Sequence, residues 1–268
     1  MVSAVLSVIT KLVESSMICG IIANINAQSR IAGGELADIT KYPFAVALLS
    51  NIESPSFLLG CGGTILTNTA ILTAASCFFA NEQITQPSSW RARVGSSSLM
   101  NGGTLYIISR ITTHPLFSMN TLEHNVAVIR TVVAMSFSTA VQPAYIAGGA
   151  YRLQRNDEVV AIGWGATSVT GSASPDLRRV QIWVNDQQTC VERYYVLNFN
   201  VTDSMLCAGW LDVGIRGQCL GDNGGPLLHN GVVVGVYSWS QGCGDIVFPN
   251  INTRVSHYSR WIEAIATA

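Results

Sequence analysis

Residues 61–77 read CGGTILTNTAILTAASC, and this stretch sets the pattern for most of the chain. Two short apolar runs, residues 63–66 and 70–72, are separated by polar residues, and a cysteine stands at each end. Short apolar runs rich in β-branched residues and bounded by Gly, Asn and Ser are typical of β-strands. The stretch therefore predicts strands rather than helices.

The same pattern of short apolar runs separated by polar residues continues on both sides of this stretch. Helical periodicity is nearly absent until the last dozen residues, where Tyr258, Trp261, Ile262 and Ile265 form one apolar stripe. We therefore expect an all-β protein with a C-terminal α-helix. The other predicted strands are residues 44–49, 91–94, 105–111, 126–132, 159–162, 179–184, 231–239 and 251–255.

The composition is that of a globular protein. Of 268 residues, 49% are apolar and 12% are charged, which excludes disorder, coiled coil and collagen. The formal net charge of −1 offers no basic surface, so nucleic acid and anionic membranes are excluded as main partners. Lys11 and Lys41 are the only lysines, and arginine keeps its charge in an alkaline medium. Compositional drift explains this bias equally well.

Residues 1–30 predict a signal peptide followed by a propeptide, with Ala27 as a plausible cleavage point. The segment lacks the basic residues that open a typical signal peptide, so a misassigned start codon is an alternative to the signal-peptide interpretation. Its apolar stretches are too short to cross a bilayer, and secretion is expected. A composition change over residues 134–149 predicts a linker, which divides the rest into two β halves, 31–145 and 146–268.

Loss of this segment removes Cys19 and leaves an even number of cysteines. In a secreted protein an even set predicts disulfides, but six cysteines allow 15 connectivities. A metal site is the rival interpretation. No CxxC pair or close Cys/His cluster supports it, and we expect neither metal nor cofactor. The six are Cys61, Cys77, Cys190, Cys207, Cys219 and Cys243.

A glycosylation sequon, Asn200-Val201-Thr202, lies in a polar stretch. Asn200 can carry a glycan if the chain is secreted, although sequons also arise by chance.

Several motifs together resemble the trypsin-like serine protease family. The first, at Arg30-Ile31-Ala32-Gly33-Gly34, is similar to the junction at which these proteins are activated by cleavage. The others follow in the family's order and spacing, and in detail the chain is most similar to digestive members from moth and butterfly larvae. These motifs are Cys61-Gly62-Gly63-Thr64, Leu72-Thr73-Ala74-Ala75-Ser76-Cys77, Gly163-Trp164-Gly165, Gly221-Asp222-Asn223-Gly224-Gly225-Pro226 and Ser238-Trp239.

The resemblance implies two six-stranded antiparallel β-barrels with a C-terminal helix. It also implies the disulfides Cys61–Cys77, Cys190–Cys207 and Cys219–Cys243, and a zymogen in which the freed amino group of Ile31 pairs with Asp222. For location it implies the extracellular space, with the alkaline midgut lumen as the candidate.

The catalytic positions depart from the family's pattern. Where the resemblance places the base, the orienting carboxylate and the nucleophile, this chain has Ser76, Asn125 and Asn223. A hydroxyl is not a base, and an amide is not a nucleophile, so the family's acyl-enzyme cannot form on these groups. The backbone N–H groups of Gly221 and Asn223 would still form the oxyanion hole.

None of the four histidines is expected to replace the missing base. His124 precedes Asn125, and neighbouring residues of an extended segment face opposite sides. The others are expected at the surface: His114, His229 and His257.

The specificity pocket implied by the resemblance has changed too. Its floor, an Asp in trypsins, is Gly217, and its walls carry Ser240 and Asn250 where the family commonly has Gly. Beside them lie Ser238 and Trp239. We expect a narrowed or filled pocket that no longer recognises Lys or Arg side chains.

These observations lead to the expectation that the chain is not an enzyme. The predicted function is that of a secreted, non-catalytic homologue that binds a protein ligand such as a protease inhibitor or another protease, or a pathogen glycan. One alternative is an active endopeptidase of protein digestion, and another is an inert secreted or storage protein. The oligomeric state is left open.

Overall fold

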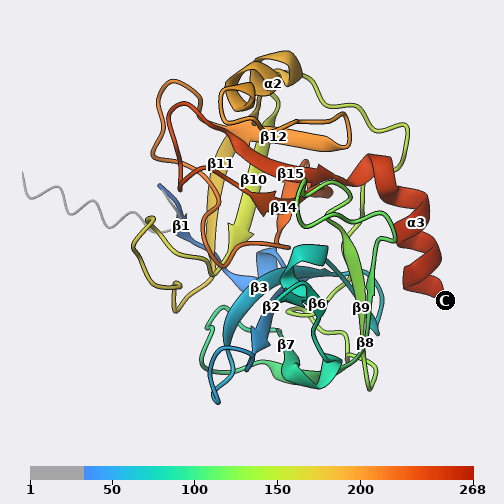
Figure 1. The fold of residues 1–268 in the computed structure, drawn as a ribbon. Coiled ribbons are helices and arrows are strands. Elements are labelled where there is room, and N and C mark those ends of the chain that lie inside the picture. Colours follow the sequence, from blue (N-terminus) through green and yellow to red (C-terminus); the bar gives the residue numbers. More distant parts are fainter. Residues whose placement is uncertain (1–32) are drawn as a thin grey trace, which may run out of the picture.

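The computed structural model describes residues 33–268. The predicted signal peptide, Cys19, Arg30 and Ile31 lie outside the described residues. The described chain forms two β-barrels, with the earlier residues in one and the later residues in the other (Figure 1). No helix within residues 33–268 is long and apolar enough to span a bilayer.

The first barrel is closed and wholly antiparallel. Its strands follow one another in the order β2-β3-β4-β9-β8-β7, and β7 pairs with β2 to close the ring. The predicted stretch of residues 61–77 supplies β4, most of β3 and the turn that joins them. The strands are β2 (Ala45–Ser50), β3 (Leu58–Ile65), β4 (Ala70–Thr73), β7 (Trp90–Val94), β8 (Thr104–Thr113) and β9 (Ala127–Thr131).

The second barrel also has six antiparallel strands. Pairing of β11 with β12 closes the ring, and the short strand β1 (Glu35–Leu36) adds to β11 from outside. The all-β architecture of two six-stranded barrels is thereby confirmed. The strands are β10 (Glu158–Gly163), β11 (Arg178–Val184), β12 (Met205–Gly209), β13 (Pro226–His229), β14 (Val232–Trp239) and β15 (Asn250–Arg254).

The C-terminal helix α3 (Val255–Thr267) packs alongside the barrels, and its buried residues include Tyr258 and Ile262 of the predicted stripe (Figure 1). It begins at Val255, where the sequence predicted the last residue of a strand. The stretch from β9 to β10 connects the barrels and contains an isolated bridge from Ile146 to Val233.

Other elements were not predicted. Helix α2 (Gln187–Tyr195) corrects the expectation that helices are nearly absent before the C-terminus. Its only buried residues are Cys190 and Tyr194, so its apolar stripe is too narrow to detect. Asp186 caps it by accepting a hydrogen bond from Thr189 N–H. The other elements that were not predicted are the strands β1, β12 and β13, the short strands β5 (Phe79–Ala80) and β6 (Gln83–Ile84), and the 3-10 helices η1 (Ile39–Lys41), η2 (Ala75–Phe78) and η3 (Pro87–Ser89).

Three disulfides join the cysteines as the resemblance implied: Cys61–Cys77, Cys190–Cys207 and Cys219–Cys243. Each closes a loop of 16 to 24 residues. In the chain-entropy model such loops stabilise the folded state by roughly 3 kcal/mol each.

Candidate active site

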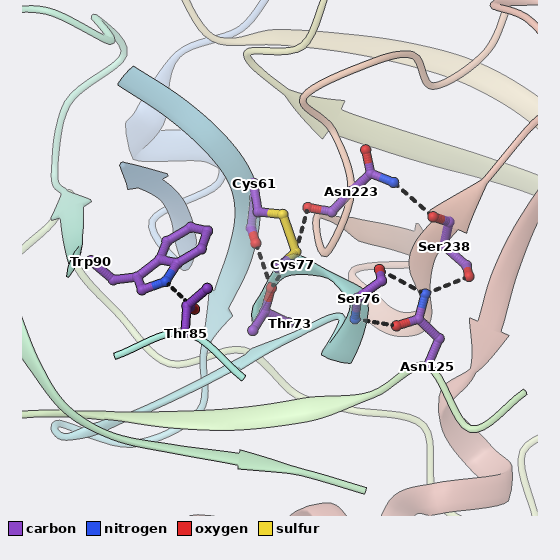
Figure 2. The surroundings of a disulfide bond; sticks show 10 residues. Cys61, Thr73, Ser76, Cys77, Thr85, Trp90, Asn125, Asn223 and Ser238 are labelled. Atoms are coloured by element: carbon purple, nitrogen blue, oxygen red, sulfur yellow. Dashed lines mark hydrogen bonds between the residues drawn. A yellow bond between two sulfur atoms is a disulfide. The ribbon is translucent and has the colours of Figure 1, made fainter. Parts of the chain in front are cut away.

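The three positions that the resemblance assigns to catalysis lie together where the two barrels meet. Ser76 lies in η2 and Asn125 in the loop before β9, both from the first barrel, while Asn223 lies in the turn before β13 (Figure 2). The N–H group of Gly62 donates a hydrogen bond to the Asn223 carbonyl at 2.7 Å. A Cβ atom on Gly62 would stand 2.8 Å from the Cα atom of Gly225, so only glycine permits this close contact between barrels.

A hydrogen-bonded network holds Ser76 and Asn125 in place (Figure 2). Asn125 Nδ2 donates to Ser76 Oγ at 3.0 Å and to Ser238 Oγ at 2.7 Å. In return, the Ser76 N–H donates to Asn125 Oδ1 at 2.8 Å. The hydroxyl of Thr253 on β15 donates to the Asn125 carbonyl at 2.7 Å, which ties the loop to the second barrel. Every group in this network is neutral.

Asn223 is held separately from that network. Its Nδ2 donates to the backbone carbonyl of Ser238 at 2.7 Å (Figure 2). Asn223 and Ser76 both line one open groove of 460 Å³, together with Leu58, Leu59 and other residues of the first barrel. The groove therefore presents a hydroxyl from Ser76 but none from the nucleophile's position.

The resemblance assigns the oxyanion hole to the backbone N–H groups of Gly221 and Asn223. Gly221 has φ +90°, a conformation that favours glycine. Within residues 33–268 the N–H groups of Gly221 and Asn223 donate to no protein acceptor, which leaves both free for a ligand. Two free donors two residues apart, one of them on a residue that lines the groove, suit a carbonyl oxygen that is gaining negative charge.

The carboxylate of Asp222 is completely enclosed behind these donors. It accepts hydrogen bonds from Gly165 N–H at 2.9 Å and from Cys219 N–H at 3.0 Å. Loss of solvent on burial outweighs these bonds and raises the pKa of Asp222 to about 7. Ile31, its implied partner, lies outside the described residues.

The histidines lie elsewhere, and two of them correct the expectation of a surface position. His114 is half-buried and stacks on His124, with ring centroids 5.0 Å apart, and burial lowers its pKa. His229 is half-buried and bonded to the Tyr151 hydroxyl at 2.8 Å, whereas His257 is exposed as expected. His124 bonds to the hydroxyl of Tyr258 at 2.8 Å and makes no hydrogen bond to the site.

Side chains crowd the positions that the resemblance assigns to the floor and walls of the specificity pocket. Asn250 Oδ1 accepts from Gln218 N–H at 3.1 Å and would stand 2.4 Å from a Cβ atom on Gly217. On the opposite wall, the hydroxyls of Ser240 and Tyr237 bond to each other at 2.7 Å. A small cavity of 160 Å³ remains between Asn223, Tyr237 and Ser240.

Three residues were not identified from the sequence: Gln218 and Tyr237 of this region, and Asn252, which lies opposite Tyr237 in the sheet. A signal for Asn252 was present, because it follows Asn250 by two positions on one strand and so shares its face. Gln218 neighbours Gly217, and Tyr237 precedes the Ser238-Trp239 motif.

Two further expectations concern other parts of the chain. Asn200 is exposed in the loop between α2 and β12, and its glycosylation stays a prediction. Within residues 33–268 no three His, Cys, Asp or Glu side chains are grouped so that they could hold a metal ion.

Comparisons with known proteins agree on the family. The Trypsin family model matches residues 31–262. The chain is 46% identical to "Trypsin, alkaline A" of Manduca sexta over 87% of this chain and 90% of that protein. It is 43% identical to "Trypsin CFT-1" of Choristoneura fumiferana over 89% and 92%. It is also 42% identical to "Achelase-1" of Lonomia achelous over 88% and 100%.

These comparisons correct one expectation. Relatives that share 43–46% of their residues with this chain are named as trypsins, which are enzymes, so the expectation that the chain is not an enzyme is wrong. The fold, the disulfides and the family match together show that this chain belongs to the trypsin-like serine protease family.

Proposed function

We propose that this chain is an extracellular endopeptidase of protein digestion that holds an extended polypeptide in the groove and hydrolyses it slowly, with a water molecule or the hydroxide formed from it as the attacking group. One observation carries the proposal: Asn223, whose N–H group is free, lines the same groove as Ser76, and the free N–H group of Gly221 is two residues away along the chain. Together these groups can bind a peptide carbonyl and a water molecule.

The step follows from the groups present. A water or hydroxide oxygen adds to the peptide carbonyl carbon, and the negative carbonyl oxygen accepts hydrogen bonds from Gly221 and Asn223 N–H. The C–N bond then breaks, and the departing amine takes a proton from water. Ser76 Oγ already accepts from Asn125, so its hydrogen and its other lone pair remain available to hold the attacking water.

The rate should be low. In serine proteases, removal of the triad costs roughly 10⁶ in kcat and leaves about 10³–10⁴ over the uncatalysed reaction, supplied by the oxyanion hole and binding. This route needs no acyl-enzyme, because water or hydroxide attacks the peptide carbonyl directly. None can form at Asn223, since its side chain has no hydroxyl to acylate.

The test is hydrolysis of a peptide library by protein cleaved after Arg30, in the presence of a fluorophosphonate. That reagent inactivates contaminating serine peptidases, but hydrolysis by this chain should survive it and follow the protein through purification. Ser76→Ala should lower the rate, while Ser54→Ala, a matched change in the same groove, should not. Activity that disappears with the reagent would contradict the proposal.

A second role for the same groove is to bind a protein ligand, either a protease inhibitor or another protease. Slow hydrolysis favours this role, because the loop of a bound inhibitor or protease would stay uncleaved for longer than in a fast peptidase. The test is surface plasmon resonance with a protein inhibitor of trypsin. Leu58→Arg, in the groove, should weaken binding, and Leu105→Arg, at a similarly exposed position on β8, should not. Equal binding by both variants would exclude the groove as the site.

The proposed location is the extracellular space, in the larval midgut lumen. Three disulfides favour an oxidising compartment. The near-absence of lysine suits an alkaline lumen.

A further inference from the structure

We propose that a cavity on the second barrel binds a neutral sugar residue of a glycan, at a site separate from the groove. The cavity has a volume of 390 Å³, which lies within the range of small-molecule sites. It shares no lining residue with the groove that contains Ser76 and Asn223. Sugar binding there is therefore independent of hydrolysis in the groove.

The cavity forms where strand pairing sets a large residue opposite a glycine. Trp183 on β11 lies opposite Gly209 on β12, and residues opposite each other in an antiparallel pair share one face of the sheet. Because Gly209 has no side chain, space remains beside the Trp183 ring. A Cβ atom at residue 209 would stand 3.6 Å from Oδ1 of Asn185, which also lines the cavity, so a side chain there would take up part of this space.

Two indole rings, those of Trp183 and Trp210, supply the aromatic surface of the cavity. Both are half-buried, and their centroids lie 5.3 Å apart with the planes tilted by 43°. The guanidinium carbon of Arg216 lies 4.5 Å from the centroid of Trp210 and holds that ring in place. Within residues 33–268 the two indole N–H groups donate to no protein acceptor, unlike those of Trp90 and Trp164. Both donors can therefore serve a ligand.

Two carboxamides, those of Asn156 and Asn185, add further donors and acceptors. Asn156 is exposed, and Oδ1 of Asn185 is buried without a hydrogen-bond partner. Buried polar atoms are almost always paired in native proteins, so an unpaired acceptor on a cavity residue indicates a ligand that donates a hydrogen bond.

The charged residues around the cavity balance one another. Hydrogen bonds from Thr189 and, more weakly, the charge of Arg155 lower the pKa of Asp186. Asp212 Oδ1 accepts a hydrogen bond from the guanidinium group of Arg193 at 2.8 Å. Each carboxylate therefore has an arginine nearby, and the cavity offers no unbalanced charge that would select an ionic ligand.

A sugar uses both kinds of group that the cavity presents. Its pyranose ring carries C–H groups that pack on an aromatic ring, and its hydroxyls both donate and accept hydrogen bonds. A quaternary ammonium ion would contact the indole rings but leave the carboxamides unused. A phosphate would meet two carboxylates. A neutral sugar is therefore the ligand that the lining favours.

The experiment follows the indole N–H signals of the intact chain by NMR. The probes are maltotriose, triacetylchitotriose, choline and inorganic phosphate, each titrated separately. At least one of the two neutral oligosaccharides should shift the signals of Trp183 and Trp210 in a saturable way. The signals of Trp90 and Trp164, whose N–H groups already donate to Thr85 and Ser97, should not move. Choline and phosphate should leave all of these signals unchanged.

Variants locate the binding site. Trp183→Leu should weaken oligosaccharide binding at least about tenfold, because it removes the ring on which the sugar packs. Asn156→Gly should weaken it about threefold or more by removing a hydrogen-bonding group. This second variant keeps the backbone, since Asn156 has φ +69°, a conformation that favours glycine. Trp261→Leu is the matched control, because Trp261 is a half-buried tryptophan on α3 outside the cavity, and it should leave binding unchanged.

The result that would overturn the inference is a titration in which neither oligosaccharide shifts the signals of Trp183 and Trp210. Oligosaccharide binding that survives both Trp183→Leu and Asn156→Gly at full strength would overturn it too, as would tighter binding of choline or phosphate. Both site variants should hydrolyse peptides at the native rate. Sugar binding by native protein that hydrolyses no peptide would support the inference and count against the peptidase alone.

Discussion

Asn125 and Ser76 hold each other through two reciprocal hydrogen bonds, from Asn125 Nδ2 to Ser76 Oγ and from Ser76 N–H to Asn125 Oδ1. Asn125 is fully buried, and its Nδ2 also donates to Ser238 Oγ. A carboxamide thus orients a hydroxyl at the centre of the site, and neither group changes its charge with pH.

Replacing Asn125 should show how much the network stabilises the fold. Asn125→Leu leaves the Ser76 N–H and the Ser238 hydroxyl without their partner and should cost about 2–4 kcal/mol of unfolding free energy. Asn125→Asp should cost less, since both serine hydroxyls can rotate to donate to a carboxylate. Denaturant unfolding checks this, with exposed Asn101→Leu as the control. Equal stability of Asn125→Leu and the native chain would contradict a stabilising role.

The pH dependence of hydrolysis should identify the attacking group. No hydrogen-bonded side chain among Ser76, Asn125 and Ser238 ionises near neutrality, so hydroxide should carry the reaction. The logarithm of kcat/KM should therefore rise with roughly unit slope from pH 7 to pH 10. A plateau beginning near pH 7 would instead reveal a titrating base such as histidine.

Restoring the family's side chains should change the mechanism. The triple variant Ser76→His, Asn125→Asp and Asn223→Ser should hydrolyse peptides at least about 10³-fold faster than the native chain. It should also react with fluorophosphonate and show an apparent pKa near 7 in its rate profile. The double variant without Asn223→Ser is the control, and it should stay unlabelled. Failure of the triple variant to gain activity would mean that the site is misaligned for acyl transfer.

Asp222 should make the uncleaved chain less stable as pH rises. Burial raises the pKa of Asp222 from 3.8 to about 7, so the folded state binds more protons than the unfolded state in that interval. Stability should be fully present below about pH 4 and should fall by up to roughly 4 kcal/mol between pH 4 and pH 7. Asp222→Asn should remove this dependence.

The measurement is urea unfolding of uncleaved protein from pH 4 to pH 8. Cleavage after Arg30 is expected to weaken the decline, because the amino group of Ile31 would favour the charged carboxylate. A native chain whose stability rises through this range would show that Asp222 is ionised in the folded state.

The specificity pocket should resist conversion by one substitution. Gly217→Asp alone would place its Cβ atom 2.4 Å from Asn250 Oδ1 and should lower the melting temperature without improving binding of an Arg peptide. Adding Asn250→Gly removes that contact and should allow Arg binding at the new carboxylate. Peptide titration of both variants checks this. Arg binding by the single variant would show that Asn250 moves aside.

Most strands could be predicted because their signals are local, whereas the two-barrel architecture and the disulfide pairing followed from the family resemblance, since cysteine spacing alone left 15 connectivities open. Apolar runs of strand length, such as residues 70–72, predict strands wherever they fall, and the order of the motifs indicates the family. Helix α2 was missed because its two buried residues leave no periodic signal. The expectation that the chain is not an enzyme was wrong. It treated substitution of the side chains at residues 76, 125 and 223 as the loss of all activity.

What the sequence by itself determined is which groups are present: a hydroxyl at residue 76, carboxamides at 125 and 223, and no carboxylate at 217. What only the tertiary structure decided is whether those groups have partners. The side-chain amide of Asn125 donates hydrogen bonds to Ser76 and Ser238. The side-chain amides of Gln218 and Asn252 are buried and have no hydrogen-bond partner. The reason is physical: a hydrogen bond forms only within about 3 Å, and which residues come that close depends on how the two barrels pack.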